Sequence, residues 1–70
     1  MAITIFLEDY FSKKERQCEI CANMSAGDLL DQLGYKQYEH YILVNGSFKP
    51  HSYILNHGDK VTLIPVPSGG

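Results

Sequence analysis

The five residues Val66-Pro67-Ser68-Gly69-Gly70 at the end of the sequence have the clearest chemical potential in the chain. Gly69 and Gly70 have no side chains, so they place a terminal carboxylate on a slender stem. Pro65 and Pro67 donate no backbone hydrogen bond and favour an extended path. Such a tail can pass through a narrow channel and present its carboxylate to the active site of another protein. A frayed terminus of small residues is the structural alternative.

Two cysteines, Cys18 and Cys21, form a CxxC pair. A structural zinc site needs four ligands, usually from two such pairs, and the sequence has no second pair. The surrounding pattern predicts a strand, where residues three apart are separated by about 10 Å. A disulfide requires Cα atoms within about 7 Å. We therefore interpret both cysteines as structural thiols.

The remaining side chains show no arrangement for catalysis or metal binding. His40, His51 and His57 lack metal-ligand spacing such as HExxH, and no pairing of His with Ser or Cys indicates a nucleophile. Neither a GxGxxG motif nor a phosphate-binding loop is present. The sequence therefore predicts no metal, no bound cofactor and no enzyme.

The length and composition of the chain limit the classes of protein to which it can belong. A chain of 70 residues forms at most one domain and buries roughly 60% of its unfolded surface. The net charge of −2, without a basic run, argues against nucleic acid as a partner. No apolar run approaches the ~20 residues that span a bilayer, and the N-terminus does not resemble a secretory signal. We expect a cytoplasmic protein without a membrane partner.

The elements that position the tail begin with a hairpin. Residues 2–7 alternate, which predicts a strand with Ile3, Ile5 and Leu7 on the core face. A polar segment turning at 12–14 leads to a second strand over 16–22, whose inward residues are Cys18, Ile20 and Ala22. Two consecutive strands joined by a short polar turn favour an antiparallel hairpin.

A short helix follows at Ser25. Ser25 is a favourable N-cap, and Asp28 three residues later resembles a capping box with Asp in place of Glu. An apolar stripe of leucines then faces the core, and Gly34 ends the helix. The stripe consists of Leu29, Leu30 and Leu33. Residues 35–40 fit either a loop or one more helical turn.

The second half of the chain returns to strands. Residues 41–44 predict a third strand, and Asn45-Gly46 is a strong signal for a type I′ hairpin turn. Residues 47–49 form the short returning strand, and residues 60–64 the last strand, with Val61 and Leu63 inward. Three residues of the irregular segment between them are expected to reach the core, namely Tyr53, Ile54 and Leu55. The order ββαβ(β)β predicts a two-layer α+β domain with later strands beside the first.

Three apolar residues are expected on the sheet face that the helix leaves open. Alternation places Phe6 opposite the inward residues of the first strand, and Ile64 opposite those of the last. Phe48, just after the hairpin turn, can join them. An apolar patch on a small polar domain usually marks a partner surface. Isolated exposed apolar residues are the alternative.

With these elements in order, the chain resembles the ubiquitin-like sulfur carriers. This family includes the thiamine-biosynthesis carrier (ThiS) and the small subunit of molybdopterin synthase (MoaD). The resemblance rests on three motifs, which are Val44-Asn45-Gly46, Gly58-Asp59-Lys60-Val61 and the final Gly69-Gly70. It implies a ubiquitin-like β-grasp fold, a mixed sheet of four to five strands with one helix across one face. Residues 1–65 would form this domain and residues 66–70 a flexible tail.

The resemblance also implies an activity. A ubiquitin-activating-like enzyme would adenylate the carboxylate of Gly70 with ATP, and sulfur would then replace the adenylate to give a thiocarboxylate. Gly69 would give the reacting carbon its freedom. A sulfur-accepting synthase would take the sulfur into thiamine or molybdopterin biosynthesis. The chain would be a protein cosubstrate, and ATP would be bound by its partner.

In this family an apolar sheet face next to the tail contacts the activating enzyme. Phe6, Phe48 and Ile64 fall at matching places, and Val66, Pro67 and Ser68 would enter the partner with the tail. The short length resembles the thiamine type, whereas the proline-containing end resembles the molybdopterin type, so both pathways stay open. A ubiquitin-like protein modifier, a permanently docked synthase subunit and a β-grasp interaction module are the alternatives.

Overall fold

The computed structural model describes residues 1–66 of the chain. The elements are two strands, a helix, a 3₁₀ turn and three further strands. Their bounds are β1 (Ala2–Asp9), β2 (Glu15–Cys21), α1 (Ala26–Leu33), η1 (Gln37–Glu39), β3 (His40–Val44), β4 (Ser47–Lys49) and β5 (Lys60–Pro65). Within the predicted tail, 66–70, only Val66 is described.

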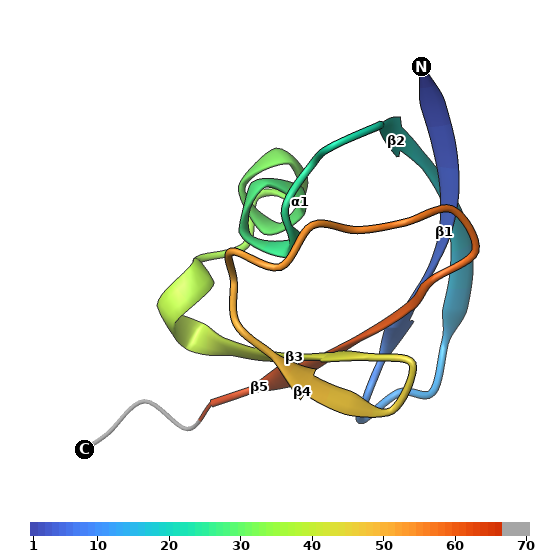
Figure 1. Cartoon of the computed structure of the whole chain (residues 1–70). Coiled ribbons are helices and arrows are strands. Elements are labelled where there is room, and N and C mark those ends of the chain that lie inside the picture. The colour runs from blue at the N-terminus through green and yellow to red at the C-terminus, as the bar shows by residue number, and fades with distance from the viewer. Residues whose placement is uncertain (67–70) are drawn as a thin grey trace.

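The strands form one five-stranded sheet in the order β2-β1-β5-β3-β4 (Figure 1). The strands β1 and β5 run parallel, and the other three pairs are antiparallel. Helix α1 lies across one face and leaves the other open (Figure 1). The predicted mixed sheet, with its later strands beside the first, is therefore confirmed.

The ends of α1 follow the local sequence. The Ser25 hydroxyl accepts a hydrogen bond from the Asp28 backbone at 3.1 Å, and the Asp28 carboxylate accepts one from the Ser25 N–H at 3.3 Å. This reciprocal pair satisfies two helix-start donors that would otherwise lack partners. Gly34 ends the helix in the left-handed conformation with φ of 87°. Both predicted caps are confirmed.

The structure confirms the predicted turn of the second hairpin but not that of the first. Asn45 and Gly46 have φ of 53° and 87°, as the predicted turn between β3 and β4 requires. The first hairpin differs, because β1 continues to Asp9 rather than stopping at residue 7. The Asp9 carboxylate accepts the backbone N–H groups of Phe11 and Ser12 at 3.0 and 3.2 Å. This local capping moves the turn toward Tyr10, ahead of the predicted position.

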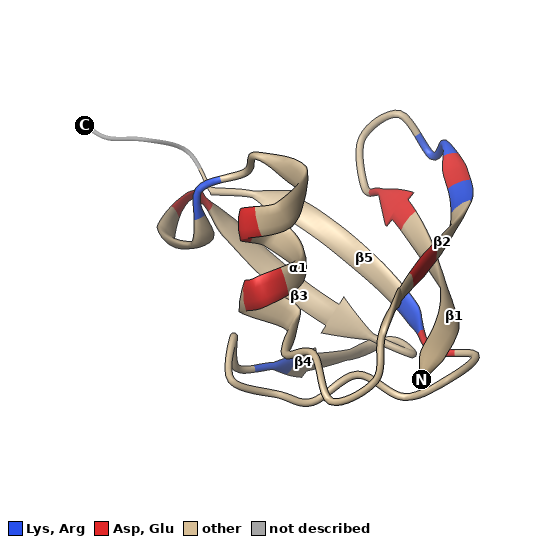
Figure 2. Cartoon of the chain, turned by 90° about the horizontal axis from the view of Figure 1, so that it is seen from above, with Lys and Arg blue, Asp and Glu red and all other residues tan. Residues whose placement is uncertain are grey.

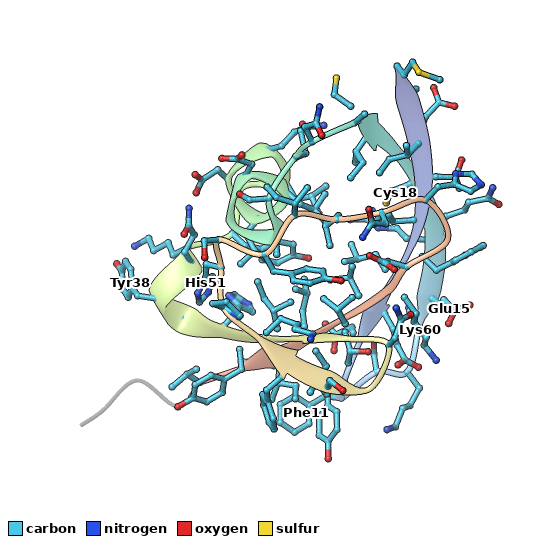
Figure 3. All side chains as sticks on the ribbon, in the orientation of Figure 1. Phe11, Glu15, Cys18, Tyr38, His51 and Lys60 are labelled. Carbon is cyan, nitrogen blue, oxygen red and sulfur yellow. The ribbon has the colours of Figure 1, made fainter. Side chains whose placement is uncertain are left out.

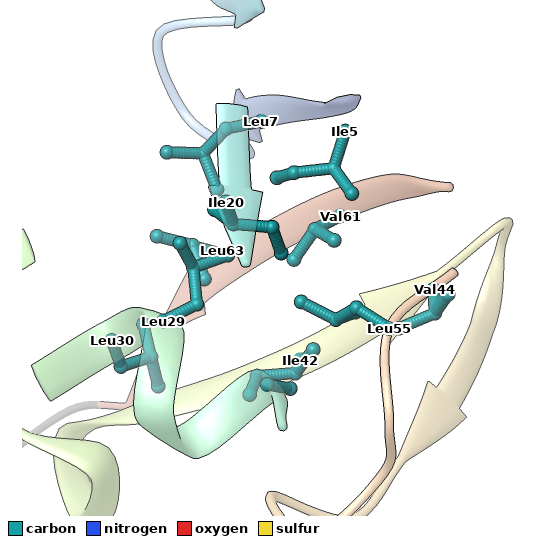
Figure 4. Close-up of a cluster of buried hydrophobic side chains, with 11 residues drawn as sticks. Ile5, Leu7, Ile20, Leu29, Leu30, Ile42, Val44, Leu55, Val61 and Leu63 are labelled. Atoms are coloured by element: carbon teal, nitrogen blue, oxygen red, sulfur yellow. The ribbon is translucent and has the colours of Figure 1, made fainter. Parts of the chain in front are cut away.

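The core lies between α1 and the sheet (Figure 4). It contains the inward residues of β1, β3 and β5 and the leucines of α1. The buried apolar residues are Ile5, Leu7, Ile20, Ala26, Leu29, Leu30, Ile42, Val44, Leu55, Val61 and Leu63. The alternation read from the sequence is thus confirmed for these strands.

One core prediction is wrong. Of the three residues expected from the irregular segment, Leu55 is buried and Tyr53 packs against the core, but Ile54 is 46% exposed. The segment runs beside the start of α1, where the Ala26 N–H donates to the Tyr53 carbonyl at 2.8 Å. Ile54 pairs with Ser25 in an isolated bridge. Because the segment is extended here, alternate side chains point away from the core.

Candidate functional site

The end of β5, from which the tail leaves, is held on both sides. The Val66 N–H donates to the Glu39 carbonyl at 2.8 Å, and Pro65 lies opposite His40 in the sheet. On the β1 side, the Tyr10 N–H donates to the Leu63 carbonyl at 3.1 Å. The root of the tail is therefore fixed in direction. The predicted site residues Pro67, Ser68, Gly69 and Gly70 lie outside the described residues.

A 3₁₀ turn supports this root. Residues 35–40, which the sequence left open between loop and helix, form η1 at Gln37–Glu39. The Gln37 side chain donates to the Asp31 carboxylate of α1 at 2.9 Å. The His40 ring lies 3.2 Å from the Lys36 carbonyl and edge-on to Tyr35, with ring centroids 5.0 Å apart. These contacts anchor the Glu39 carbonyl that receives Val66.

Aromatic side chains gather on the open face near the tail root. Tyr41 meets Phe48 edge-on at 6.2 Å between ring centroids, and Tyr41 lies opposite Ile64 in the sheet. At the β1–β2 turn, Tyr10 and Phe11 make a second edge-on pair at 5.3 Å. Figure 3 shows Phe11 on the side of the sheet away from α1. We call Tyr10, Phe11, Tyr41 and Phe48 the aromatic surface.

The side chains of the aromatic surface are exposed, which indicates a role in binding rather than in folding. Phe11 and Phe48 are 71% and 70% exposed, and the two tyrosines are also exposed. An exposed aromatic ring contributes little to folding, yet such rings dominate the binding energy of protein interfaces. The aromatic surface therefore has the chemistry of a docking site beside the tail.

Register separates one predicted residue from this surface. Phe48 and Ile64 both approach Tyr41, whereas Phe6 lies opposite Lys60, four residues before Ile64 on β5. A polar cluster borders Phe6, in which the Lys60 ammonium lies 3.6 Å from the Glu8 carboxylate and 3.4 Å from that of Glu15. The three predicted residues share one face, but Phe6 is not continuous with the other two.

The same cluster affects a titration. The negative charges of Glu8 first, and then of Glu15, raise the pKa of the exposed Lys60 ammonium above its ordinary value. The Thr62 hydroxyl also donates to Glu8 at 3.3 Å. These polar contacts cross β2, β1 and β5 on the open face, so they form a boundary to the aromatic surface.

Sequence reasoning missed three members of the aromatic surface. For Tyr41 a signal existed, since alternation with the inward Ile42 and Val44 places it on the open face. Tyr10 and Phe11 lie in a turn, where alternation has no meaning. Two aromatic residues inside an otherwise polar turn were the available signal, because turns rarely bury them.

A pocket of about 400 Å³ opens on the opposite face. It is near the tail root, since Leu63 and Tyr35 contribute to it together with the β1–β2 hairpin. Figure 2 shows the basic positions of this hairpin close to its turn. Neither Lys14 nor Arg16 has an ion-pair partner within residues 1–66. The pocket thus combines apolar walls with two basic and two acidic side chains, and its lining is Leu7, Asp9, Ser12, Lys14, Glu15, Arg16, Tyr35 and Leu63.

The residues first considered for metal or redox chemistry lie apart. Cys18 is half-buried and Cys21 exposed, and both are free thiols. Cys18 and Cys21 are three residues apart on β2, so their side chains lie on opposite faces of the sheet. The part of the chain that the structure describes contains no cluster of three His, Cys, Asp or Glu residues suited to a metal. It also contains no helix long and apolar enough to cross a membrane.

Comparison with protein families gives one match over nearly the whole chain. The model of the ThiS family matches residues 3–70. Among curated protein sequences, none matches significantly.

Solved structures show the same fold at low identity. Small archaeal modifier protein 1 of Haloferax volcanii has a TM-score of 0.73 at 15% identity, covering 93% of this chain and 99% of its own. A Pyrococcus furiosus protein described as molybdopterin converting factor subunit 1 has 0.73 at 19% identity, with coverage of 93% and 99%. A ubiquitin of Caldiarchaeum subterraneum has 0.73 at 15% identity and full coverage of both chains. The fold is therefore the ubiquitin-like β-grasp, as expected.

Proposed function

The chain belongs to the ThiS family, and from this premise we propose that it is a sulfur carrier. An activating enzyme adenylates the carboxylate of Gly70 with ATP and releases pyrophosphate. A sulfur donor then displaces AMP, which leaves a thiocarboxylate on Gly70. A synthase of the thiamine or molybdopterin type accepts that sulfur, and the carrier returns to a carboxylate. The chain is consumed and regenerated in this cycle without catalysing it.

The observation that carries this proposal is the extent of the family match, which reaches residue 70 and so includes Gly69-Gly70. A carboxylate is a poor electrophile until it becomes a mixed anhydride, so it must enter the nucleotide site of another protein. Residues without side chains can follow such a narrow path. The fixed position of Val66 gives this path a defined starting point.

Affinity for the partner must come from the folded domain, because two glycines and a carboxylate offer little surface. We assign this role to the aromatic surface together with Ile64, which lies beside the tail root. Phe6 contributes at the far side of the polar cluster. Val66, Pro67 and Ser68 then enter the partner with the tail. A docked domain would hold Gly70 at the reacting nucleotide while the sheet itself stays unchanged.

The test begins with the intact mass of protein from its native host. Exchange of oxygen for sulfur resembles one oxidation in mass, and the chain contains oxidisable Met and Cys residues. Sulfur on the peptide that ends in Gly70, trapped there by a thiol-selective alkylating reagent, supports the carrier function. In a second assay, purified chain is mixed with ATP and candidate activating enzymes. If no candidate forms an adenylate with the intact chain, the proposal fails.

A second function is favoured by the likeness to small archaeal modifier protein 1. In that case the activated Gly70 would be joined to lysines of target proteins. The activation step is the same, and only the acceptor differs. Conjugates that survive a denaturing gel would favour the modifier, whereas sulfur release to a synthase without conjugates favours the carrier. Stable copurification with a synthase would instead indicate a permanent subunit, as the name of the Pyrococcus furiosus protein suggests.

A further inference from the structure

The two edges of the sheet differ in how they are protected. The strand β4, at one edge, has only three residues and is followed by Pro50. The strand β2, at the other edge, has seven residues and contains no Pro, Gly or Lys. Short strands, prolines and charged side chains, lysine above all, are the usual means by which proteins block pairing between edges. The β2 edge is long and has no proline or lysine, and its charged residues are Glu15, Arg16 and Glu19.

Hydrogen-bond alternation shows which groups of β2 are available. The Asp9 N–H donates to the Lys14 carbonyl, and the Ala22 N–H donates to the Met1 carbonyl. In an antiparallel pair, hydrogen-bonded positions recur at every second residue. The positions of Arg16, Cys18 and Ile20 therefore bond to β1, and the backbone groups of Gln17 and Glu19 point away from it. Within residues 1–66, β1 is the sole strand paired with β2.

We propose that β2 pairs antiparallel with β2 of a second copy of the chain. A twofold axis requires a self-complementary edge, and the side chains select one register. When Cys18 faces Cys18 of the second copy, Gln17 faces Glu19 and no like charges are opposed. A shift by two residues places Glu19 opposite another glutamate. A shift by one residue would bring opposite faces of the two sheets together.

This register has a measurable consequence at Cys18. Because Cys18 bonds to β1 through its backbone, its pairing with the second copy is of the non-hydrogen-bonded kind. Cα atoms in such pairs are about 4.5 Å apart, which lies within the range for a disulfide. Cys21 would instead face Glu15 of the second copy. The half-buried thiol is thus expected to form a crosslink that the exposed thiol does not.

The dimer is compatible with carrier function but does not depend on it. The strand order places β2 at the edge far from β3 and β4, which carry Tyr41 and Phe48. Antiparallel pairing directs the two β5 strands in opposite directions. Each copy therefore keeps Tyr41, Phe48 and its tail root free for a partner, whereas Tyr10 and Phe11 lie in the β1–β2 turn next to the paired edge.

Mild oxidation with diamide tests the register. Two Cys18 thiols would lose two electrons and two protons to diamide, and one S–S bond would form between the copies. We expect a disulfide-linked dimer on a non-reducing gel for the wild type and for Cys21→Ser, and none for Cys18→Ser. Crosslinking that depends on Cys21, or its absence in every variant, would overturn the proposal.

Charge changes at Gln17 test the pairing without any cysteine chemistry. Gln17 is exposed, so its variants should fold as the wild type does. Gln17→Lys places two attractive pairs with Glu19 across the edge and should tighten the dimer about fivefold, and Gln17→Glu should loosen it similarly. Gln17→Pro removes an outward N–H and should give a monomer by sedimentation equilibrium. Equal masses for all four proteins at the concentrations of an NMR sample would contradict the dimer.

Discussion

The side chains of each strand alternate between the two faces of the sheet, but one face is buried and the other is exposed. On one face, residues of β1, β3 and β5 pack against the leucines of α1 and are buried. On the other, Tyr41 and Phe48 remain exposed, as do the aromatic residues of the first turn. The helix makes the difference, because it covers one face only (Figure 1).

This contrast separates stability from recognition. A buried side chain contributes by leaving water and by filling space that nothing else fills. An exposed ring leaves water only when a partner arrives, so its energy is available for binding. In a chain of this size the core has few members, and each of them matters for folding. Substitutions on the two faces should therefore have different readouts.

The largest effect is expected at the centre of the buried face. Leu30→Ala should lower the free energy of unfolding by about 2–5 kcal/mol, because Leu30 is fully inaccessible to solvent and its removal leaves a cavity. Urea denaturation followed by circular dichroism measures the loss. The matched control is Leu33→Ala on the same helix, where partial burial predicts a smaller loss. Equal losses of unfolding free energy in the two variants would show that Leu30 and Leu33 contribute equally to the core, contrary to their difference in burial.

The open face should respond in binding alone. Phe48→Ala should leave the unfolding free energy within about 0.5 kcal/mol of wild type and weaken binding to the activating enzyme about 10- to 100-fold. Titration calorimetry with the enzyme gives the affinity. Ile54→Ala is the control, because Ile54 is exposed but lies beside the start of α1. If both variants bind as the wild type does, the aromatic surface is not the docking site.

A smaller effect is expected at the cap of α1, the element that distinguishes the two faces. Ser25→Ala removes the hydroxyl that accepts the Asp28 N–H and should cost about 1 kcal/mol of stability. Thermal unfolding of the variant is compared with that of Ser52→Ala, an exposed serine in the following irregular segment. The two variants should differ; identical melting curves would mean that the capping box contributes nothing measurable.

The smallest effect concerns the polar cluster on the open face. The pKa of Lys60 is raised in the folded state by Glu8 and Glu15. Because the pKa of Lys60 is higher in the folded than in the unfolded state, its ion pairs stabilise the fold fully at any pH below the unfolded pKa. This stabilisation disappears as the pH rises through the folded pKa. We therefore expect a slight loss of stability above pH 10.5 that Lys60→Gln abolishes. If the Lys60→Gln variant loses as much stability at high pH as the wild type does, other titrating groups cause the loss.

The local elements could be predicted because their signals are local. The capping box at Ser25 and Asp28 involves neighbours within one helical turn, and Asn45-Gly46 specifies its turn through backbone preference alone. Alternation separated the two faces of β5 correctly, with Val61 and Leu63 inward. The end of β1 was misjudged, because Asp9 caps the turn through its side chain and allows the strand to continue.

The site was only partly predictable. Ile64 was placed on the open face by alternation and Phe48 by its position just after the hairpin turn, and the structure brings both to Tyr41. Phe6 was grouped with them, although the parallel register of β1 against β5 places it beside Lys60 instead. Alternation reports which face a residue occupies but not its position along the neighbouring strand. Tyr10 and Phe11 were missed for a related reason, since a turn has no periodicity.

The sequence by itself determined the types of the elements, their caps, the inward and outward residues of each strand, and the Gly-Gly end. These properties depend on preferences within a few residues. Only the tertiary structure decided which side chains become neighbours, namely the aromatic pairs beside β5 and the polar cluster that separates Phe6 from them. It also decided that β2 is an edge strand. Neighbours across a sheet depend on register and strand order, which are set by the packing of the whole core.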